Sequence, residues 1–157
     1  MKKMIKKQII IIVTLAAAIF LAVFYTWSAN IKNNNHDTQT KQVCYDDRCF
    51  NVELAITSEE QERGLMEREK LSSDSGMLFI YQSEGDHSFW MKNTKIPLDM
   101  IWIDKDLKVV SIVTAEPCLA DPCPIYDPQK QAKYVLELNA STAKNINLKE
   151  GDEVTFK

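Results

Sequence analysis

The sequence GMLFIYQSEGDHSFWMKNTKIPLDMIWID occupies residues 76–104 and contains two short apolar runs, at residues 77–81 and 98–103. A glycine precedes the first run and a proline precedes the second. Runs this short, with turn residues at their ends, are typical of buried strands. The loop between them ends in Phe-Trp-Met at residues 89–91, and exposed loops rarely contain three large apolar side chains in a row. We therefore expect this loop to fold back onto the core.

Further strands are predicted on both sides of this stretch. Residues 50–57 (FNVELAIT) and 134–139 (YVLELN) alternate between apolar and polar side chains, and residues 108–114 and 153–156 have strand composition. Because these strands follow one another through short connections, we predict an α+β domain. Its main part would be an antiparallel β-sheet or a small barrel.

One or two short helices accompany the strands. Ser58 can cap a helix in which Gln61 reaches back to the cap, and Gly64 is a plausible end of that helix. Residues 141–146 can form one or two further helical turns.

Five short motifs occur together along this region. They are Arg63-Gly64-Leu65-Met66, Gly76-Met77-Leu78-Phe79, Phe89-Trp90-Met91-Lys92-Asn93-Thr94, Pro97-Leu98-Asp99 and Tyr134-Val135-Leu136-Glu137. In order and spacing they resemble the domain of unknown function 192 (DUF192, UPF0127) family over residues 43–157. The resemblance implies a largely antiparallel α+β domain with an unassigned biochemical role. One departure is Ser141, which follows Asn-Ala where the family has a glycine.

The N-terminal region predicts a membrane anchor. Residues 9–27 contain no charged side chain, and as a helix they would span about 28 Å, which is close to the hydrocarbon thickness of a bilayer. Tyr25 and Trp27 suit the membrane–water interface, and the four lysines before residue 9 predict a cytoplasmic N-terminus. A cleaved signal peptide is the alternative, although Trp-Ser-Ala at residues 27–29 is a poor cleavage site.

These features divide the chain into four parts: a cytoplasmic basic flank (1–8), a transmembrane helix (9–27), a polar linker (28–42) and an extracytoplasmic domain (43–157). We therefore predict a single-pass protein of the cell membrane. Without the four N-terminal lysines the chain has 15 basic and 22 acidic side chains, a net charge of −7. Phosphate backbones are bound by clustered Lys and Arg, so we expect no nucleic-acid partner.

The four cysteines form two close pairs, Cys44 with Cys49 and Cys118 with Cys123. A two-residue hairpin turn at Asp46-Asp47 would place Cys44 opposite Cys49, within reach of a disulfide. A second disulfide would staple the proline-rich loop around Cys118. A zinc site made by all four thiolates is the alternative, but an oxidising compartment favours disulfides.

Two carboxylates are expected on buried strand faces. Asp99 shares its predicted strand face with Ile101 and Ile103, and Glu137 shares its face with Val135. A carboxyl group in such a place needs hydrogen-bond partners or must be held uncharged, which is one way functional acids arise. The competing interpretation is structural, with Asp99 accepting hydrogen bonds from the nearby loop backbone.

Three consecutive polar residues next to a tryptophan form a candidate binding site. Lys92, Asn93 and Thr94 follow Trp90, and together they could hold an anionic or sugar-like ligand over the indole. Loop hydrogen bonding is the structural alternative. The candidate ligand-binding residues are therefore Trp90, Lys92, Asn93, Asp99 and Glu137.

No known catalytic signature occurs in the sequence. We expect a domain that binds a small ligand or an envelope protein and needs no cofactor. One alternative is an envelope-associated hydrolase that uses Asp99, Glu137 or His87 as acid or base. A third hypothesis is metal handling through thioether, imidazole or thiolate groups, although methionine usually fills cores. Its candidate ligands are Met66, Met77, Met91, His87 and the cysteines.

Overall fold

The computed structural model describes residues 41–157. The predicted basic flank (1–8), the predicted transmembrane helix (9–27) and all but the end of the predicted linker lie outside the described residues. Within the described part, no helix is long and apolar enough to cross a membrane.

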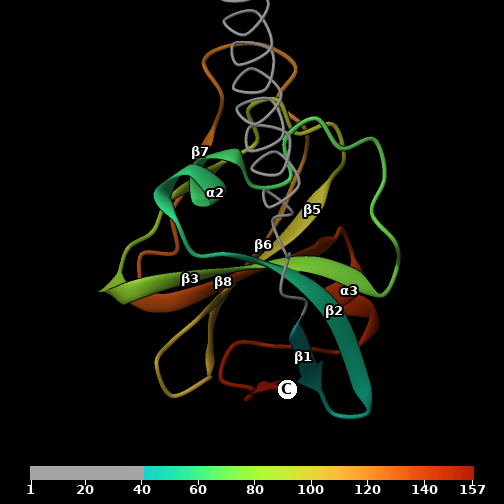
Figure 1. Ribbon diagram of the computed structural model, residues 1–157, viewed down its shortest axis with the longest axis vertical. Helices are drawn as coiled ribbons and strands as arrows, with labels where there is room; N and C mark the ends of the chain where they lie inside the picture. The colour runs from blue at the N-terminus through green and yellow to red at the C-terminus, as the bar shows by residue number, and fades with distance from the viewer. Residues whose placement is uncertain (1–40) are drawn as a thin grey trace, which may run out of the picture. The chain divides into compact units, whose positions relative to one another are not determined.

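Nine strands and two short helices make up the described part of the chain (Figure 1). The strands are β1 (Lys41–Tyr45), β2 (Arg48–Ala55), β3 (Ser75–Gly85), β4 (Phe89–Trp90), β5 (Leu98–Ile103), β6 (Val109–Ala115), β7 (Ile125–Tyr126), β8 (Ala132–Asn139) and β9 (Thr155–Phe156). The helices are α2 (Ser58–Arg63) and α3 (Thr142–Asn145). The domain is therefore mainly β rather than α+β, because its two helices have only six and four residues.

Seven strands form one sheet in the order β6-β5-β8-β3-β2-β1-β9, and β4 and β7 form a separate two-stranded sheet. Neighbouring strands are antiparallel, as predicted, except β2 and β3, which are parallel. Parallel neighbours need a long crossover connection, and the segment that contains α2 supplies it. In Figure 1, α2 and β7 lie on one side of β3 and β8, and β1 and the C-terminus lie on the other.

The large sheet curls into a half-barrel because the C-terminal segment links its two edges. β9 pairs with β1, and just before it the backbone of residues 152–154 bonds to the start of β6 and to the turn that precedes it. Val109 N donates to Asp152 O at 2.8 Å, and Val154 N donates to Leu107 O at 2.9 Å. The prediction of a small barrel is thus right in part.

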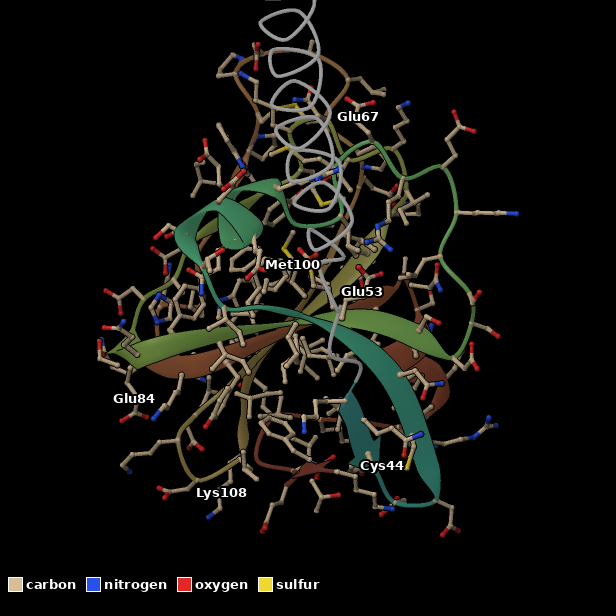
Figure 2. All side chains as sticks on the ribbon, viewed as in Figure 1. Cys44, Glu53, Glu67, Glu84, Met100 and Lys108 are labelled. Atoms are coloured by element: carbon tan, nitrogen blue, oxygen red, sulfur yellow. A yellow bond between two sulfur atoms is a disulfide. The ribbon has the colours of Figure 1, made fainter. Side chains whose placement is uncertain are left out.

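The curl separates two hydrophobic clusters. The inner cluster lies inside the curl and consists of Val43, Phe50, Val52, Leu78, Ile101, Ile103, Val109, Leu136, Leu138, Ala143, Leu148 and Val154. The outer cluster lies between the sheet and the segments that carry α2 and β4, and consists of Ala55, Leu65, Met77, Phe79, Met91, Ile96, Leu98, Met100, Trp102, Ala115, Ala132 and Val135. Figure 2 shows Met100 in the interior, with Glu84 and Lys108 at the periphery.

Helix α2 begins one residue earlier than predicted. Thr57, rather than Ser58, is the N-cap: its hydroxyl accepts from Glu60 N at 3.3 Å, and the Glu60 carboxylate accepts from Thr57 N at 2.8 Å. This reciprocal capping box satisfies two backbone donors at the helix start. Gly64 ends the helix at φ 45°, as predicted.

The loop after β3 folds back onto the outer cluster only in part. Met91 is 1% exposed and Phe89 packs against the outer cluster, so the prediction is right for these two side chains. It is wrong for Trp90, which is 43% exposed. Pairing of β4 with β7 explains the difference, because alternate residues of a strand point to opposite faces.

Ser141 adopts a left-handed backbone conformation, with φ 69° and ψ 1°. This is the position where the resemblance to the family leads us to expect a glycine, and a non-glycine residue there is strained. We expect Ser141→Gly to raise the free energy of unfolding by about 1 kcal/mol. Chemical denaturation would measure this change. Ser141→Ala, which keeps the strain, should give no gain, and equal stabilities of the two variants would contradict the explanation.

Candidate functional site

Both predicted disulfides are present. Cys44 pairs with Cys49 across the β1–β2 hairpin in the predicted register, and Cys118 pairs with Cys123 in the loop before β7. The described cysteines therefore include no free thiol, which removes the thiolate zinc alternative. The second disulfide staples a loop whose Cys118 N donates to Met91 O at 3.4 Å.

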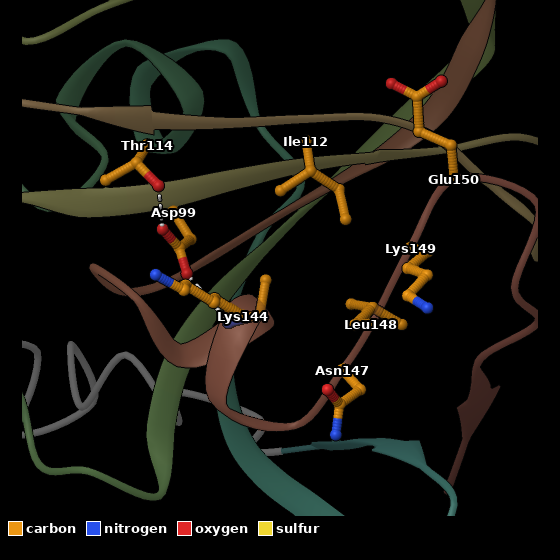
Figure 3. A pocket seen from close by; sticks show the side chains of 9 residues that line it. Asp99, Ile112, Thr114, Lys144, Asn147, Leu148, Lys149 and Glu150 are labelled. Atoms are coloured by element: carbon orange, nitrogen blue, oxygen red, sulfur yellow. Dashed lines mark hydrogen bonds between the residues drawn. The ribbon is translucent and has the colours of Figure 1, made fainter.

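Asp99 faces the inside of the curl and is 1% exposed. Its Oδ1 accepts from Thr114 Oγ1 at 2.7 Å and from Ser141 N at 3.0 Å, and its Oδ2 accepts from Ala143 N at 2.8 Å. Figure 3 shows the carboxylate between Thr114 and the first turn of α3, at the edge of a surface pocket of about 450 Å³. Asp99 therefore fastens α3 to the sheet, which is the structural role weighed above, though through α3 rather than the nearby loop.

Glu137 lies on the opposite face of the same sheet. It belongs to β8, its cross-strand neighbours are Met77 and Met100, and it is 4% exposed. Its Oε2 has no hydrogen-bond partner among the described residues. Burial raises the pKa of Glu137 from its ordinary value of 4.5 to about 8, so the carboxyl group is mostly protonated at neutral pH.

A glycine fixes the backbone beside Glu137. A Cβ atom at Gly76 of β3 would lie 2.5 Å from Glu137 O and 2.7 Å from Leu138 Cδ2. Only glycine permits this approach of β3 to β8, which is the physical reason for the glycine in the Gly-Met-Leu-Phe motif.

A narrow cavity, which we call the Glu137 pocket, lies on the outer face around this carboxyl group. It is lined by Gln61, Glu62, Arg63, Gly64, Leu65, Met66, Phe79, Phe89, Trp90, Thr94 and Glu137. A wider hollow of about 480 Å³, the Trp90 groove, is lined by Glu59, Glu62, Arg63, Met66, Trp90, Lys92 and Asn93. The two share four lining residues, so the groove and the pocket are adjacent.

The exposed ring of Trp90 lies at the junction of the pocket and the groove. Lys92 Nζ is 5.4 Å from the centroid of that ring, which is cation–π distance. The same ammonium group lies 3.8 Å from Asp121 Oδ1 in the disulfide-stapled loop. The loop thus contacts the rim of the groove through this ion pair.

Four of the five predicted ligand residues share the outer face. Trp90 and Glu137 line the Glu137 pocket, and Lys92 and Asn93 line the groove beside it. Asp99 does not join them, because alternation along β5 directs it into the inner cluster.

His87 lines neither the Glu137 pocket nor the Trp90 groove, and its ring hydrogen-bonds neither Asp99 nor Glu137. Its ring stacks on Tyr81 at 3.4 Å between centroids, and its Nε2 is 3.2 Å from Ser83 O. Of the methionines proposed as metal ligands, Met77 and Met91 are buried in the outer cluster and Met66 lines the pocket.

Sequence reasoning missed the contribution of α2 to the site. Glu62 and Arg63 line both hollows, and Phe79 and Phe89 form the apolar wall of the pocket. Arg63 and Phe79 belong to two of the five sequence motifs, so the motifs could have indicated that these two residues contribute to the site. Glu62 carries no such signal, because its position depends on how α2 packs over the sheet.

A curled β-sheet with an aromatic pocket on its outer face defines a small β domain with a candidate ligand site. The chain belongs to the DUF192 family, described as "Uncharacterized ACR", whose model matches residues 40–156. The family prediction is therefore confirmed.

Two UPF0127 proteins of archaea are similar over 110 residues, one from Thermococcus kodakarensis at 27% identity and one from Thermococcus gammatolerans at 29%. Each match covers 67% of this chain, and the chain spans 64% and 65% of the two relatives.

Two solved structures share the fold, each with a TM-score of 0.66 over 74% of this chain. One is from Sinorhizobium meliloti 1021, described as a proposed transcription regulator, with 33% identity and 92% of its length covered. The other is a protein of unknown function from Novosphingobium aromaticivorans, with 35% identity and 83% covered.

Proposed function

We propose that this protein is a membrane-tethered, extracytoplasmic binding domain whose ligand site is the Glu137 pocket together with the Trp90 groove. The observation that carries this proposal is Glu137 Oε2, a buried polar atom that has no hydrogen-bond partner within residues 41–157 and lies in a cavity that adjoins an exposed tryptophan. Leaving such an atom unpaired costs about 1–3 kcal/mol, so a ligand that satisfies it gains that energy on binding. The rest of the pocket is aromatic and apolar, which is the usual lining of a ligand site.

Binding is favoured over hydrolysis by the placement of the acidic groups. A general acid and base act on one substrate from within hydrogen-bond reach of it. Asp99 and Glu137 lie on opposite faces of the sheet and line different pockets. Asp99 is also occupied by three hydrogen bonds that hold α3.

The partner we propose is a small molecule rather than nucleic acid. The relative from Sinorhizobium meliloti is described as a proposed transcription regulator. The part of this chain after its four N-terminal lysines carries a net charge of −7, which disfavours contact with a phosphate backbone.

The membrane anchor and the extracytoplasmic location of the domain belong to the same proposal. Two disulfides in the described domain favour an oxidising compartment. The uncharged residues 9–27 after four lysines favour an anchor with a cytoplasmic N-terminus.

Alkylation followed by mass spectrometry tests this location. We expect the full chain, extracted without reductant, to carry no alkylated cysteine, and to carry four after reduction. Labelling of Cys44 or Cys123 by a thiol reagent delivered to the cytosol of intact cells would contradict both the topology and the redox state.

Trp90→Ala tests the site itself. Small polar ligands found by an NMR fragment screen of the full chain in detergent should shift the Trp90 indole N–H signal. They should bind at least about tenfold more weakly to Trp90→Ala. The matched control is Ile125→Ala, which removes the exposed cross-strand neighbour of Trp90 but does not line either hollow. Hits that bind both variants equally would count against the proposed site.

A further inference from the structure

The Glu137 pocket combines one buried carboxyl group with three aromatic rings. Phe79 and Phe89 meet edge to face with centroids 4.8 Å apart, and Trp90 lines the same cavity. The faces of aromatic rings carry negative potential and attract cations, most strongly where water is excluded. A carboxyl group that can ionise and accept hydrogen bonds, together with such rings, suits an organic cation.

The size of the cavity limits which cation can enter. The cavity beside Glu137 measures about 30 Å³, whereas the Trp90 groove measures about 480 Å³. A primary ammonium group is smaller than a guanidinium or a trimethylammonium group, so it suits the narrow cavity best. An alkyl chain attached to the ammonium group would extend into the Trp90 groove.

We propose that the Glu137 pocket binds the primary ammonium group of a small aliphatic amine, with Glu137 as its counter-ion and the three rings around it. This inference rests on the proposed ligand site and names the chemical class of its ligand. Glu137 Oε2, which has no partner among the described residues, accepts a hydrogen bond from the ammonium group.

None of the other charged or titratable groups around Glu137 replaces it as the counter-ion of the ammonium group. Tyr81 of β3 stays neutral, because burial and then the charge of Glu137 raise its pKa to about 12. On α2, Glu62 and Arg63 are exposed and of opposite sign, so water screens them and their effects partly cancel. The neighbours on β3 and β5, Met77 and Met100, are apolar.

Binding an ammonium ion is coupled to release of a proton. In the free protein the Glu137 carboxyl group holds its proton at neutral pH, and the ammonium ion favours the ionised form. The carboxyl O–H bond breaks, its proton goes to the buffer, and the amine keeps its own proton. The affinity for an amine should therefore rise roughly fiftyfold between pH 6 and pH 8 and then level off.

The test is an NMR titration of the full chain in detergent at pH 6, 7 and 8, following the Trp90 indole N–H. The probes are n-butylammonium, its neutral analogue butan-1-ol and the oversized tetramethylammonium ion. We expect n-butylammonium to bind at least tenfold more tightly than either of the others at pH 8. Glu137→Gln should lose this affinity and its pH dependence, whereas Glu153→Gln, which removes an exposed carboxylate outside the pocket, should keep both.

The outcomes separate the two proposals. If butan-1-ol binds as tightly as n-butylammonium and neither affinity depends on pH, the ligand site stands and the ammonium class is wrong. If none of the probes shifts Trp90 at any pH, the ammonium class is wrong, and the Trp90→Ala screen then decides on the site itself. If tetramethylammonium binds best, the size argument fails and the inference with it.

Discussion

Replacing Asp99 by alanine is expected to lower the free energy of unfolding by about 3 kcal/mol or more. The substitution leaves the buried Ala143 N and the part-buried Ser141 N and Thr114 hydroxyl without their acceptor, and an unpaired donor shielded from water costs about 1–3 kcal/mol. It also removes the carboxylate that holds the first turn of α3. Chemical denaturation of the purified protein measures the change.

Two further measurements separate this structural role from a role in binding. Thr114→Val removes one of the three donors and should cost about 1 kcal/mol, so it is the matched partial variant. Ligand binding by folded Asp99→Ala protein should be unchanged, since Asp99 lies on the inner face of the sheet. A variant of wild-type stability that no longer binds ligand would contradict the structural assignment.

Replacing Glu137 by glutamine is expected to stabilise the protein by about 4 kcal/mol at pH 8 and to have little effect below pH 4.5. The pKa of Glu137 is about 8 in the folded chain against an ordinary value of 4.5, so between these values only the folded chain holds the proton. The contribution of Glu137 to the stability of the wild type is therefore most favourable below pH 4.5, becomes less favourable as the pH rises to about 8, and levels off above it. Each unit of pKa difference corresponds to about 1.4 kcal/mol.

The difference between wild type and variant isolates this effect, because the other carboxylates contribute equally to both proteins. Denaturation curves at pH 4, 6 and 8 are sufficient. Glu153→Gln serves as the control, since that side chain is exposed and should give no such trend. A Glu137→Gln variant less stable than wild type at pH 8 would show that Glu137 is ionised and paired.

Much of the fold follows from patterns within single strands. Alternation in YVLELN places Leu136 and Glu137 on opposite faces of β8, and the structure has them so. The two-residue turn at Asp46-Asp47 sets the register that brings Cys44 opposite Cys49. These predictions succeed because strand periodicity and turn geometry are local properties.

The features that sequence reasoning missed depend on segments that are distant in the chain. The parallel pairing of β2 with β3 requires α2 to cross over the sheet, which no local signal reveals. The partners of Asp99 lie more than forty residues away at Ser141 and Ala143. Pairing of β4 with β7 decides that Trp90 is exposed while Met91 is buried. The candidate site lies where these long-range contacts meet, so its composition could be predicted only in part.

The most direct measurement is the titration of the Glu137 side-chain carboxyl group by ¹³C NMR in the free protein. A neutral, buried carboxyl group whose Oε2 has no partner in the described part of the chain predicts an apparent pKa of about 8, absent from the spectrum of Glu137→Gln. Titration near the ordinary value of 4.5 would show that Glu137 is hydrated or paired, and would remove the reason for placing the ligand site there.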